Sequence, residues 1–189
     1  SDVCSSDLQF SLRIVLSMMP AALIGYFFED IISSQFFGNT VLVGLMLWIT
    51  AGLLYIADKP TENRANVSLT NAWWIGIAQA FAILPGVSRS GATIAISLLL
   101  GVARDRAARF SFLMVVPLIF GSMAKKILDG GLEQEVLSLS PILAGFMAAF
   151  ISGYLACRWM IALVKRSQLR YFAYYCALVG TISLVTSLV

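Results

Sequence analysis

The stretch Q-A-F-A-I-L-P-G-V-S-R-S-G-A-T, from Gln79 to Thr93, places one arginine and three hydroxyl side chains inside a chain that is otherwise mostly apolar. Pro85 and Gly86 end the helix before them, because proline removes a backbone donor and glycine permits positive φ angles. A second helix can begin after Gly91. The stretch therefore predicts a broken helix with Arg89 at the break.

Arg89 needs a partner, because a charged side chain at membrane depth costs at least ~2.5–3.5 kcal/mol. The sequence around it contains no acidic residue. Ser88 or Ser90 can cap the restarted helix, whose first N–H groups then point toward the same place as Arg89. We predict an anion-binding site at mid-membrane, as found where half-helices meet a substrate. The alternative is a kinked helix whose arginine extends to the headgroups.

This region resembles a known family in four runs of sequence. They are P-G-V-S-R-S-G-A-T (Pro85 to Thr93), G-I-A-Q-A-F (Gly76 to Phe81), G-V-A-R (Gly101 to Arg104) and R-F-S-F-L-M-V-V-P (Arg109 to Pro117). Together they look like the second half of the undecaprenyl-diphosphatase family, also called the bacitracin-resistance proteins. The resemblance runs from about Leu12 to the C-terminus, which implies the C-terminal two-thirds of the family pattern only.

The resemblance implies a phosphatase of the bacterial cytoplasmic membrane that recycles the carrier lipid for peptidoglycan synthesis. It would hydrolyse undecaprenyl diphosphate to undecaprenyl phosphate and inorganic phosphate, and so confer resistance to bacitracin. Position by position, it implies catalytic roles for Arg89, Ser88 and Thr93. The expected substrate contacts are Ser90, Gly91, Gly86 and Gln79. Phe110 and Ser111 also match the family, and we expect them to pack. A divalent cation, Mg or Ca, is implied by the family alone, and we expect no metal ligands in this chain.

One feature of the family has no counterpart here. Its members carry an earlier motif with glutamates, a serine and a histidine on a first hairpin. The sequence has no histidine at all, and we see no acid within a predicted membrane segment. We therefore expect a truncated chain that lacks the hairpin of the first repeat and is inactive alone. Residues 1–8, S-D-V-C-S-S-D-L, are expected to be a non-native leader, and residues 9–189 a single transmembrane domain.

The composition excludes a soluble domain. The chain is 59% hydrophobic and 12% charged, and its mean hydropathy is +0.87. These values indicate an integral membrane protein. The net charge of +3 suits basic cytoplasmic loops, and we expect no nucleic-acid partner. Without histidine, a phosphohistidine intermediate, a Ser–His dyad and a histidine-ligated metal are all excluded for this chain alone.

Five apolar runs are expected to cross the membrane, and two shorter runs are not. The expected spans are 9–28, 41–57, 110–123, 142–164 and 171–189, and the short runs are 72–84 and 94–100, with a polar loop at 58–70. If the short runs form a hairpin that enters and leaves on one face, ten of the basic residues share a side and only Lys125 and Lys126 oppose them. The positive-inside rule therefore favours a re-entrant hairpin entering from the cytoplasm.

We accordingly predict an all-α polytopic membrane protein with five transmembrane helices and one re-entrant helical hairpin, forming part of an inverted-repeat bundle. The C-terminus is expected outside the cytoplasm. The expected partners are an isoprenyl diphosphate lipid and the bilayer, and a homodimer is possible. The residues alone also allow a transporter or scramblase of anionic lipid headgroups, since such proteins use broken helices.

Overall fold

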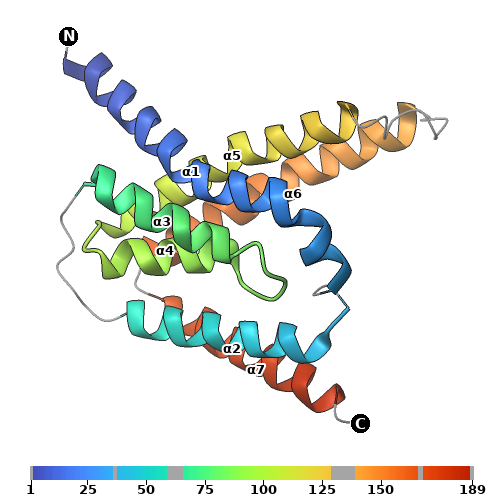
Figure 1. Cartoon of the computed structure of the whole chain (residues 1–189). Coiled ribbons are helices and arrows are strands. Elements are labelled where there is room, and N and C mark those ends of the chain that lie inside the picture. Colours follow the sequence, from blue (N-terminus) through green and yellow to red (C-terminus); the bar gives the residue numbers. More distant parts are fainter. Residues whose placement is uncertain (1, 36–37, 59–65, 129–138, 166–167, 188–189) are drawn as a thin grey trace.

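The fold is a bundle of helices in a computed structural model of the chain, which describes residues 2–35, 38–58, 66–128, 139–165 and 168–187 (Figure 1). Within these ranges all regular structure is helical, as predicted. The helices are α1 (Asp2–Gln35), α2 (Thr40–Ala57), α3 (Leu69–Phe81), α4 (Arg89–Leu99), α5 (Arg104–Leu128), α6 (Leu139–Lys165) and α7 (Leu169–Thr186).

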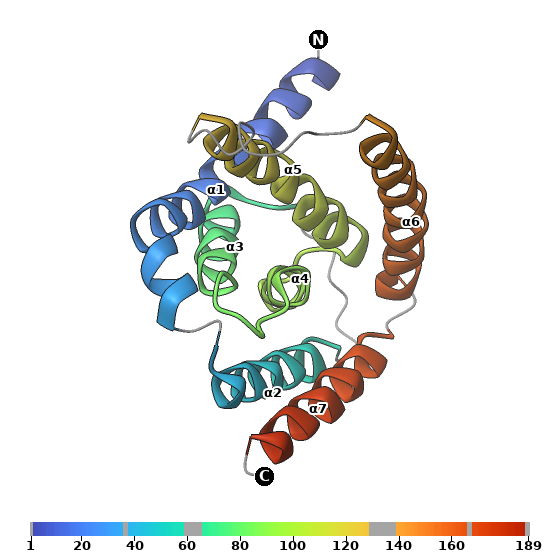
Figure 2. The ribbon, with the colours of Figure 1, turned by 90° about the vertical axis from the view of Figure 1, so that its right-hand side faces the viewer.

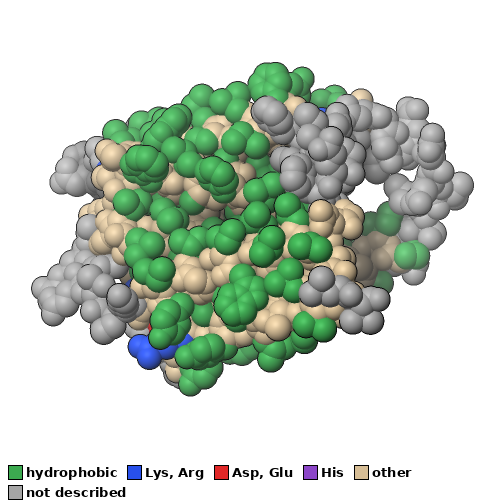
Figure 3. All heavy atoms as spheres, turned by 60° about the horizontal axis from the view of Figure 1, so that its bottom comes forward, with side chains coloured by type: hydrophobic (Ala, Val, Ile, Leu, Met, Phe, Trp, Pro, Cys, Tyr) green, Lys and Arg blue, Asp and Glu red, His purple; other side chains and the backbone are tan. Residues whose placement is uncertain are grey.

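Five of these helices are long and apolar enough to cross a membrane, which confirms the predicted number of spans. The qualifying segments are Phe10–Phe27, Thr40–Ala57, Arg104–Lys125, Pro141–Val164 and Leu169–Thr186. Hydrophobic side chains cover most of the outer face shown in Figure 3, and the basic side chains visible on it gather mainly near one end. A surface of this kind suits contact with lipid.

The remaining helices, α3 and α4, are too short to cross. At 1.5 Å per residue α3 is ~20 Å long and α4 ~17 Å, against a hydrocarbon core of ~30 Å. They pack side by side (Figure 1). Val67 leads into α3 and Val102 follows α4, and both are buried in the same hydrophobic cluster. Figure 1 shows the start of α3 and the end of α4 at the same end of the pair, as the predicted re-entrant hairpin requires.

Helix α1 runs parallel to α5, and three contacts along their length show it. The rings of Phe10 and Phe110 meet edge to face with centroids 5.8 Å apart. Further along, the Ser17 hydroxyl lies 2.9 Å from Met114 Sδ, and beyond it Lys125 Nζ lies 5.7 Å from the centre of the Tyr26 ring. The N-terminal ends of these two spans therefore share one face of the bundle, and Lys125 lies at the other.

Helices α2 and α7 pack closely and antiparallel. At one end Ser183 Oγ donates to the carbonyl of Thr40, and at the other Asp58 contacts the start of α7. Between them, a Cβ atom on Gly44 would lie 3.0 Å from the Gly180 carbonyl oxygen, so the two backbones approach as they do in small-residue membrane interfaces. Figure 2 shows α4 inside the bundle, with α2, α3 and α5 around it.

Several helices begin or end away from the positions that we predicted. α3 begins at Leu69 instead of Ala72, because Ser68 caps it by accepting a hydrogen bond from Asn71 N. α4 begins at Arg89, ahead of Gly91. α5 begins at Arg104, six residues ahead of the expected start of this span at residue 110, and Asp105 pairs there with Arg109 one turn later.

The end of α1 and the burial of Asp58 after α2 also differ from the prediction. α1 continues to Gln35, although the first span was expected to end at residue 28. Asp58 was expected in an exposed loop, but it follows directly on the last residue of α2 and is buried. Residues 59–65 of that expected loop lie outside the described residues.

Candidate anion site at the start of α4

The turn between α3 and α4 lies against the N-terminal half of α2. A Cβ on Gly86 would lie 2.6 Å from the Val43 carbonyl oxygen, and the φ angle of Gly86 is +93°. Farther along, Ser88 N lies 3.4 Å from Thr50 Oγ1, near the middle of α2. The start of α4 is thus held at mid-span, deep between helices that the sequence makes apolar.

Ser88 is the N-cap of α4, which settles which of the two predicted serines has this role. Its backbone is extended, and its side-chain oxygen accepts a 3.2 Å hydrogen bond from Gly91 N. The cap uses the oxygen as an acceptor, so the hydroxyl hydrogen of Ser88 can still be donated. Helix α4 therefore begins with an ordered turn whose remaining N–H groups carry the positive end of the helix dipole.

Arg89 is the first residue of α4 and is half-buried. Among the described residues its guanidinium forms no ion pair and no hydrogen bond. Ser90 beside it is also half-buried. The structure therefore brings a guanidinium, a helix N-terminus and the hydroxyls of Ser88 and Ser90 into one short segment. Such an arrangement can bind an oxyanion.

The hydroxyl of Thr93 lies away from solvent. Thr93 Oγ1 donates to the Arg89 carbonyl at 2.9 Å and lies 3.3 Å from the Ser90 carbonyl. One turn later Ser97 Oγ donates to the Thr93 carbonyl at 2.6 Å. Thr93 thus uses its proton within the first turn of α4, and its direct effect is on the backbone that carries Arg89.

Gln79 is completely buried in α3, one turn before the break. Neither its Nε2 nor its Oε1 atom has a hydrogen-bond partner. A buried amide without partners costs roughly 1–3 kcal/mol. Ser111 on α5 is also buried, and its hydroxyl lacks a partner too. Such groups are usually matched by bound water or a ligand, so Gln79 keeps its place as a candidate substrate contact.

The two glycines of the motif are required by packing. At Gly86 the positive φ angle and the nearby Val43 carbonyl both exclude a side chain. At Gly91 a Cβ would lie 3.0 Å from Ser88 Oγ, against the capping bond itself. Their direct contact with a substrate remains a prediction. Phe110 is fully buried, and its packing role is confirmed.

Asp58 is the important residue that sequence reasoning missed. Its Oδ2 accepts from Arg170 Nε at 2.9 Å, and its Oδ1 accepts from Leu169 N at 3.3 Å and lies 3.6 Å from Arg104 Nη1. Asp58 precedes the hairpin segment and Arg104 follows it, so this pair joins the two ends of the re-entrant unit. The available signal was a single acid directly after a long apolar run.

The described residues do not form a metal site of their own. No three Cys, Asp or Glu side chains among them come close enough to hold an ion. Asp58 is already occupied by two arginines, and Asp105 pairs with Arg109. The divalent cation implied by the family therefore finds no group of three such ligands within the described ranges.

The family model and the similar proteins that match this chain point to the same family. Residues 2–182 match the model of the Bacitracin resistance protein BacA family. An undecaprenyl-diphosphatase from Christiangramia forsetii is 51% identical over 96% of this chain and 69% of its own length. One from Bacteroides fragilis is 45% identical over 97% of the chain and 70% of its own length. One from Methanobrevibacter smithii is 38% identical over 93% of the chain and 64% of its own length.

The family match begins at residue 2, so our expectation that the resemblance begins at about Leu12 is wrong. The expected restriction to the C-terminal two-thirds is likewise not borne out, because the match runs over nearly the whole chain. The non-native origin of residues 1–8 stays a prediction. With a family model that covers most of its length and relatives of this similarity, the chain belongs to the Bacitracin resistance protein BacA family.

Proposed function

We propose that this chain supplies the diphosphate-binding site of an integral-membrane undecaprenyl-diphosphate phosphatase, an enzyme that hydrolyses undecaprenyl diphosphate to undecaprenyl phosphate and inorganic phosphate. The names of the relatives support the activity. The observation that carries the proposal is Arg89, a guanidinium without a protein partner among the described residues, at the start of a helix held at mid-span. A lipid diphosphate brings the missing negative charge to that depth.

Hydrolysis of a lipid diphosphate requires chiefly that the negative charge on its phosphates is neutralised. A nucleophile attacks the terminal phosphorus, the bond from that phosphorus to the bridging oxygen breaks, and undecaprenyl phosphate leaves with the electron pair. Arg89 can bind two phosphate oxygens with its planar fork. The N–H groups at the start of α4 and the hydroxyl of Ser88 or Ser90 add further donors. Thr93 holds the turn that carries these groups.

The exposed apolar helices suit the isoprenyl chain, which would stay in lipid while its headgroup enters the bundle. We place the protein in the bacterial cytoplasmic membrane, with the C-terminus outside the cytoplasm, where it would recycle the carrier lipid for cell-wall synthesis. A homodimer remains a prediction, which light scattering of the purified protein in detergent can check.

Activity of these 189 residues alone is a separate question. The sequence has no histidine, and the described acids Asp58 and Asp105 lie in ion pairs at helix ends. We therefore expect the chain to bind the lipid diphosphate without hydrolysing it. Phosphate release from undecaprenyl diphosphate by the purified chain would refute this expectation and would support the enzyme assignment directly.

Binding of undecaprenyl diphosphate tests the site whether or not the chain is active. Hydrogen bonds to charged groups contribute ~1.5–3 kcal/mol, so Arg89→Gln should weaken binding about 10-fold or more. Arg89→Lys keeps the charge but loses the fork, and should fall in between. Arg158→Gln, an exposed position on α6, is the matched control. Equal affinities for the Arg89 and Arg158 variants would overturn the proposed site.

The transporter or scramblase reading is distinguished by a flip assay in proteoliposomes. The transporter reading would be favoured if the labelled diphosphate lipid moves between leaflets and no phosphate is released. This result should hold even when the part of an active relative that this chain does not match is added to the purified chain. The phosphatase proposal expects Arg89→Gln to abolish hydrolysis in any active form of the protein.

A further inference from the structure

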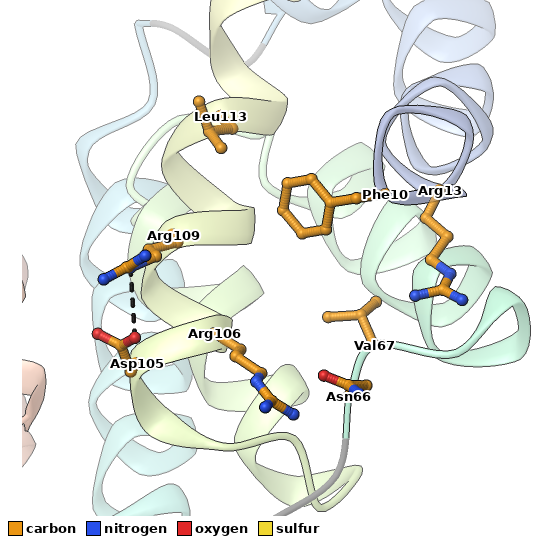
Figure 4. Close-up of a pocket in the computed structure, with 8 residues that line it drawn as sticks. All are labelled: Phe10, Arg13, Asn66, Val67, Asp105, Arg106, Arg109 and Leu113. Carbon is orange, nitrogen blue, oxygen red and sulfur yellow. Dashed lines mark ion pairs between the residues drawn. The ribbon is translucent and has the colours of Figure 1, made fainter. Parts of the chain in front are cut away.

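A second group of arginines surrounds a cavity at the other end of the hairpin, far along the bundle from the start of α4. The cavity has a volume of about 330 Å³ and lies between the start of α5, the start of the α1 span and the segment that leads into α3 (Figure 4). The described residues that line it are Phe10, Arg13, Asn66, Val67, Asp105, Arg106, Arg109 and Leu113.

The charges around this cavity favour an anion. Three arginines and one aspartate line it. Arg109 Nε lies 3.2 Å from Asp105 Oδ2, which accounts for the acid within the lining. Arg106 is exposed and forms no ion pair with a described residue. In Figure 4 its side chain extends from α5 toward Asn66. The first turn of α5 adds the positive end of a long helix.

Besides Asn66, the uncharged lining residues are apolar, and the cavity lies near the first residues of two candidate spans, where lipid headgroups are expected. Phe10 is the first residue of one candidate span, and Leu113 lies within the first half of another. Leu113 is 47% exposed, so the cavity wall is continuous with the lipid-facing surface. A free phosphate would not use such a wall, whereas a phospholipid places its phosphate among cations and its upper acyl chain on apolar side chains.

We propose that this cavity binds the headgroup of an anionic phospholipid, with Arg106 on the phosphate and Phe10 and Leu113 against the first acyl carbons. A volume of about 330 Å³ lies at the lower end for ligand cavities and suits a headgroup rather than a whole lipid. The site is separate from the predicted catalytic one and does not depend on it. Bound there, the lipid bridges α1, α5 and the entry to the hairpin.

Native mass spectrometry of the detergent-purified full chain, titrated with phosphatidylglycerol or phosphatidylcholine, tests the proposal. One juxtamembrane arginine contributes enough that Arg106→Gln should weaken the tightest phosphatidylglycerol site about fivefold. Phosphatidylcholine binding should not change. Arg158→Gln removes an exposed arginine from α6 and is the matched control, expected to bind like the unmodified chain. Melting temperatures of both variants verify that they are folded.

A second arm separates the two sources of phosphate. Inorganic phosphate is added at millimolar concentration to the phosphatidylglycerol complex, and we expect no displacement. Displacement by phosphate in the unmodified chain but not in Arg106→Gln would show a site for the free ion and overturn the lipid proposal. Equal phosphatidylglycerol affinities for Arg106→Gln and Arg158→Gln would overturn it as well.

Discussion

Arg170 Nε donates a 2.9 Å hydrogen bond to Asp58 Oδ2, and this pair joins the start of α7 to the end of α2. Arg104, which follows the hairpin, lies 3.6 Å from the same carboxylate. The end of α2, the start of α5 and the start of α7, which are distant in sequence, therefore meet at one buried carboxylate. Because the hairpin leaves from Asp58 and returns to Arg104, we expect this contact to hold both of its ends in place.

The first prediction is that Asp58→Asn destabilises the protein. Removing one partner of a fully buried ion pair costs ~3–5 kcal/mol, but Arg170 is largely exposed, so we expect about 2 kcal/mol. That loss corresponds to a melting temperature lower by about 4–8 °C. Asp105→Asn is the control, since its pair with Arg109 is an exposed one-turn pair on α5. Similar melting temperatures for the two variants would contradict the central role of Asp58.

The second prediction concerns the crossing of α1 and α3. A Cβ on Gly76 would collide with the Ser17 carbonyl oxygen, which is backbone and cannot turn aside. Gly76→Ala should therefore push the helices apart at a cost of ~1–3 kcal/mol, seen as a lower melting temperature. Gly52→Ala on α2 meets nothing within 4 Å and should leave stability equal or slightly higher. If both variants melt alike, the close approach does not stabilise the bundle.

The third prediction separates backbone strain from crowding in the hairpin turn. Gly86 and Gly101 both have positive φ angles, +93° and +81°. Alanine at either position costs roughly 1–2 kcal/mol for the left-handed backbone. Only at Gly86 would the new Cβ also press on Val43, because Gly101 has open space. Gly86→Ala should thus lower both the melting temperature and the affinity for undecaprenyl diphosphate, whereas Gly101→Ala should lower stability alone. Unchanged affinity in Gly86→Ala would separate the turn from the binding site.

The features of the fold that could be predicted from the sequence are those set by residues close together in the chain. The five spans follow from apolar runs and the broken helix from Pro85 and Gly86, which are local signals. The hairpin followed from the sidedness of the arginines. The helix ends were misjudged where charges lie on a helix, as at Asp105, because a pair one turn apart keeps them there. The burial of Asp58 was not predictable, since its partners come from distant segments.

The fourth prediction is the sidedness of the membrane. The contact of Asp58 with Arg104 and Leu169 places the entry to the hairpin and the start of α7 on one face. Single cysteines at Asn66 and Gln168, in a chain freed of its native cysteines, should react with a membrane-impermeant maleimide from the same side. A cysteine at Gly38, before α2, should react from the other. Labelling of Asn66 and Gln168 from opposite sides would rule out the re-entrant arrangement.

The fifth prediction uses the amide of Gln79, which is fully buried and has no hydrogen-bond partner. Such a group destabilises a protein by roughly 1–3 kcal/mol unless bound water or a ligand supplies the missing hydrogen bonds. Gln79→Met keeps the volume and removes the polar atoms, so it should raise the melting temperature. If the amide binds the substrate, the same change should weaken binding of undecaprenyl diphosphate about tenfold.

Ser111→Ala is the matched control, because this hydroxyl is also buried without a partner and is expected only to pack. It should leave affinity unchanged and stability equal or higher. If Gln79→Met raises the melting temperature and weakens substrate binding, while Ser111→Ala leaves binding unchanged, Gln79 contributes to binding at the cost of stability. A less stable Gln79→Met variant with unchanged affinity would instead make the amide a structural group, and the predicted site would then rest on the start of α4 alone.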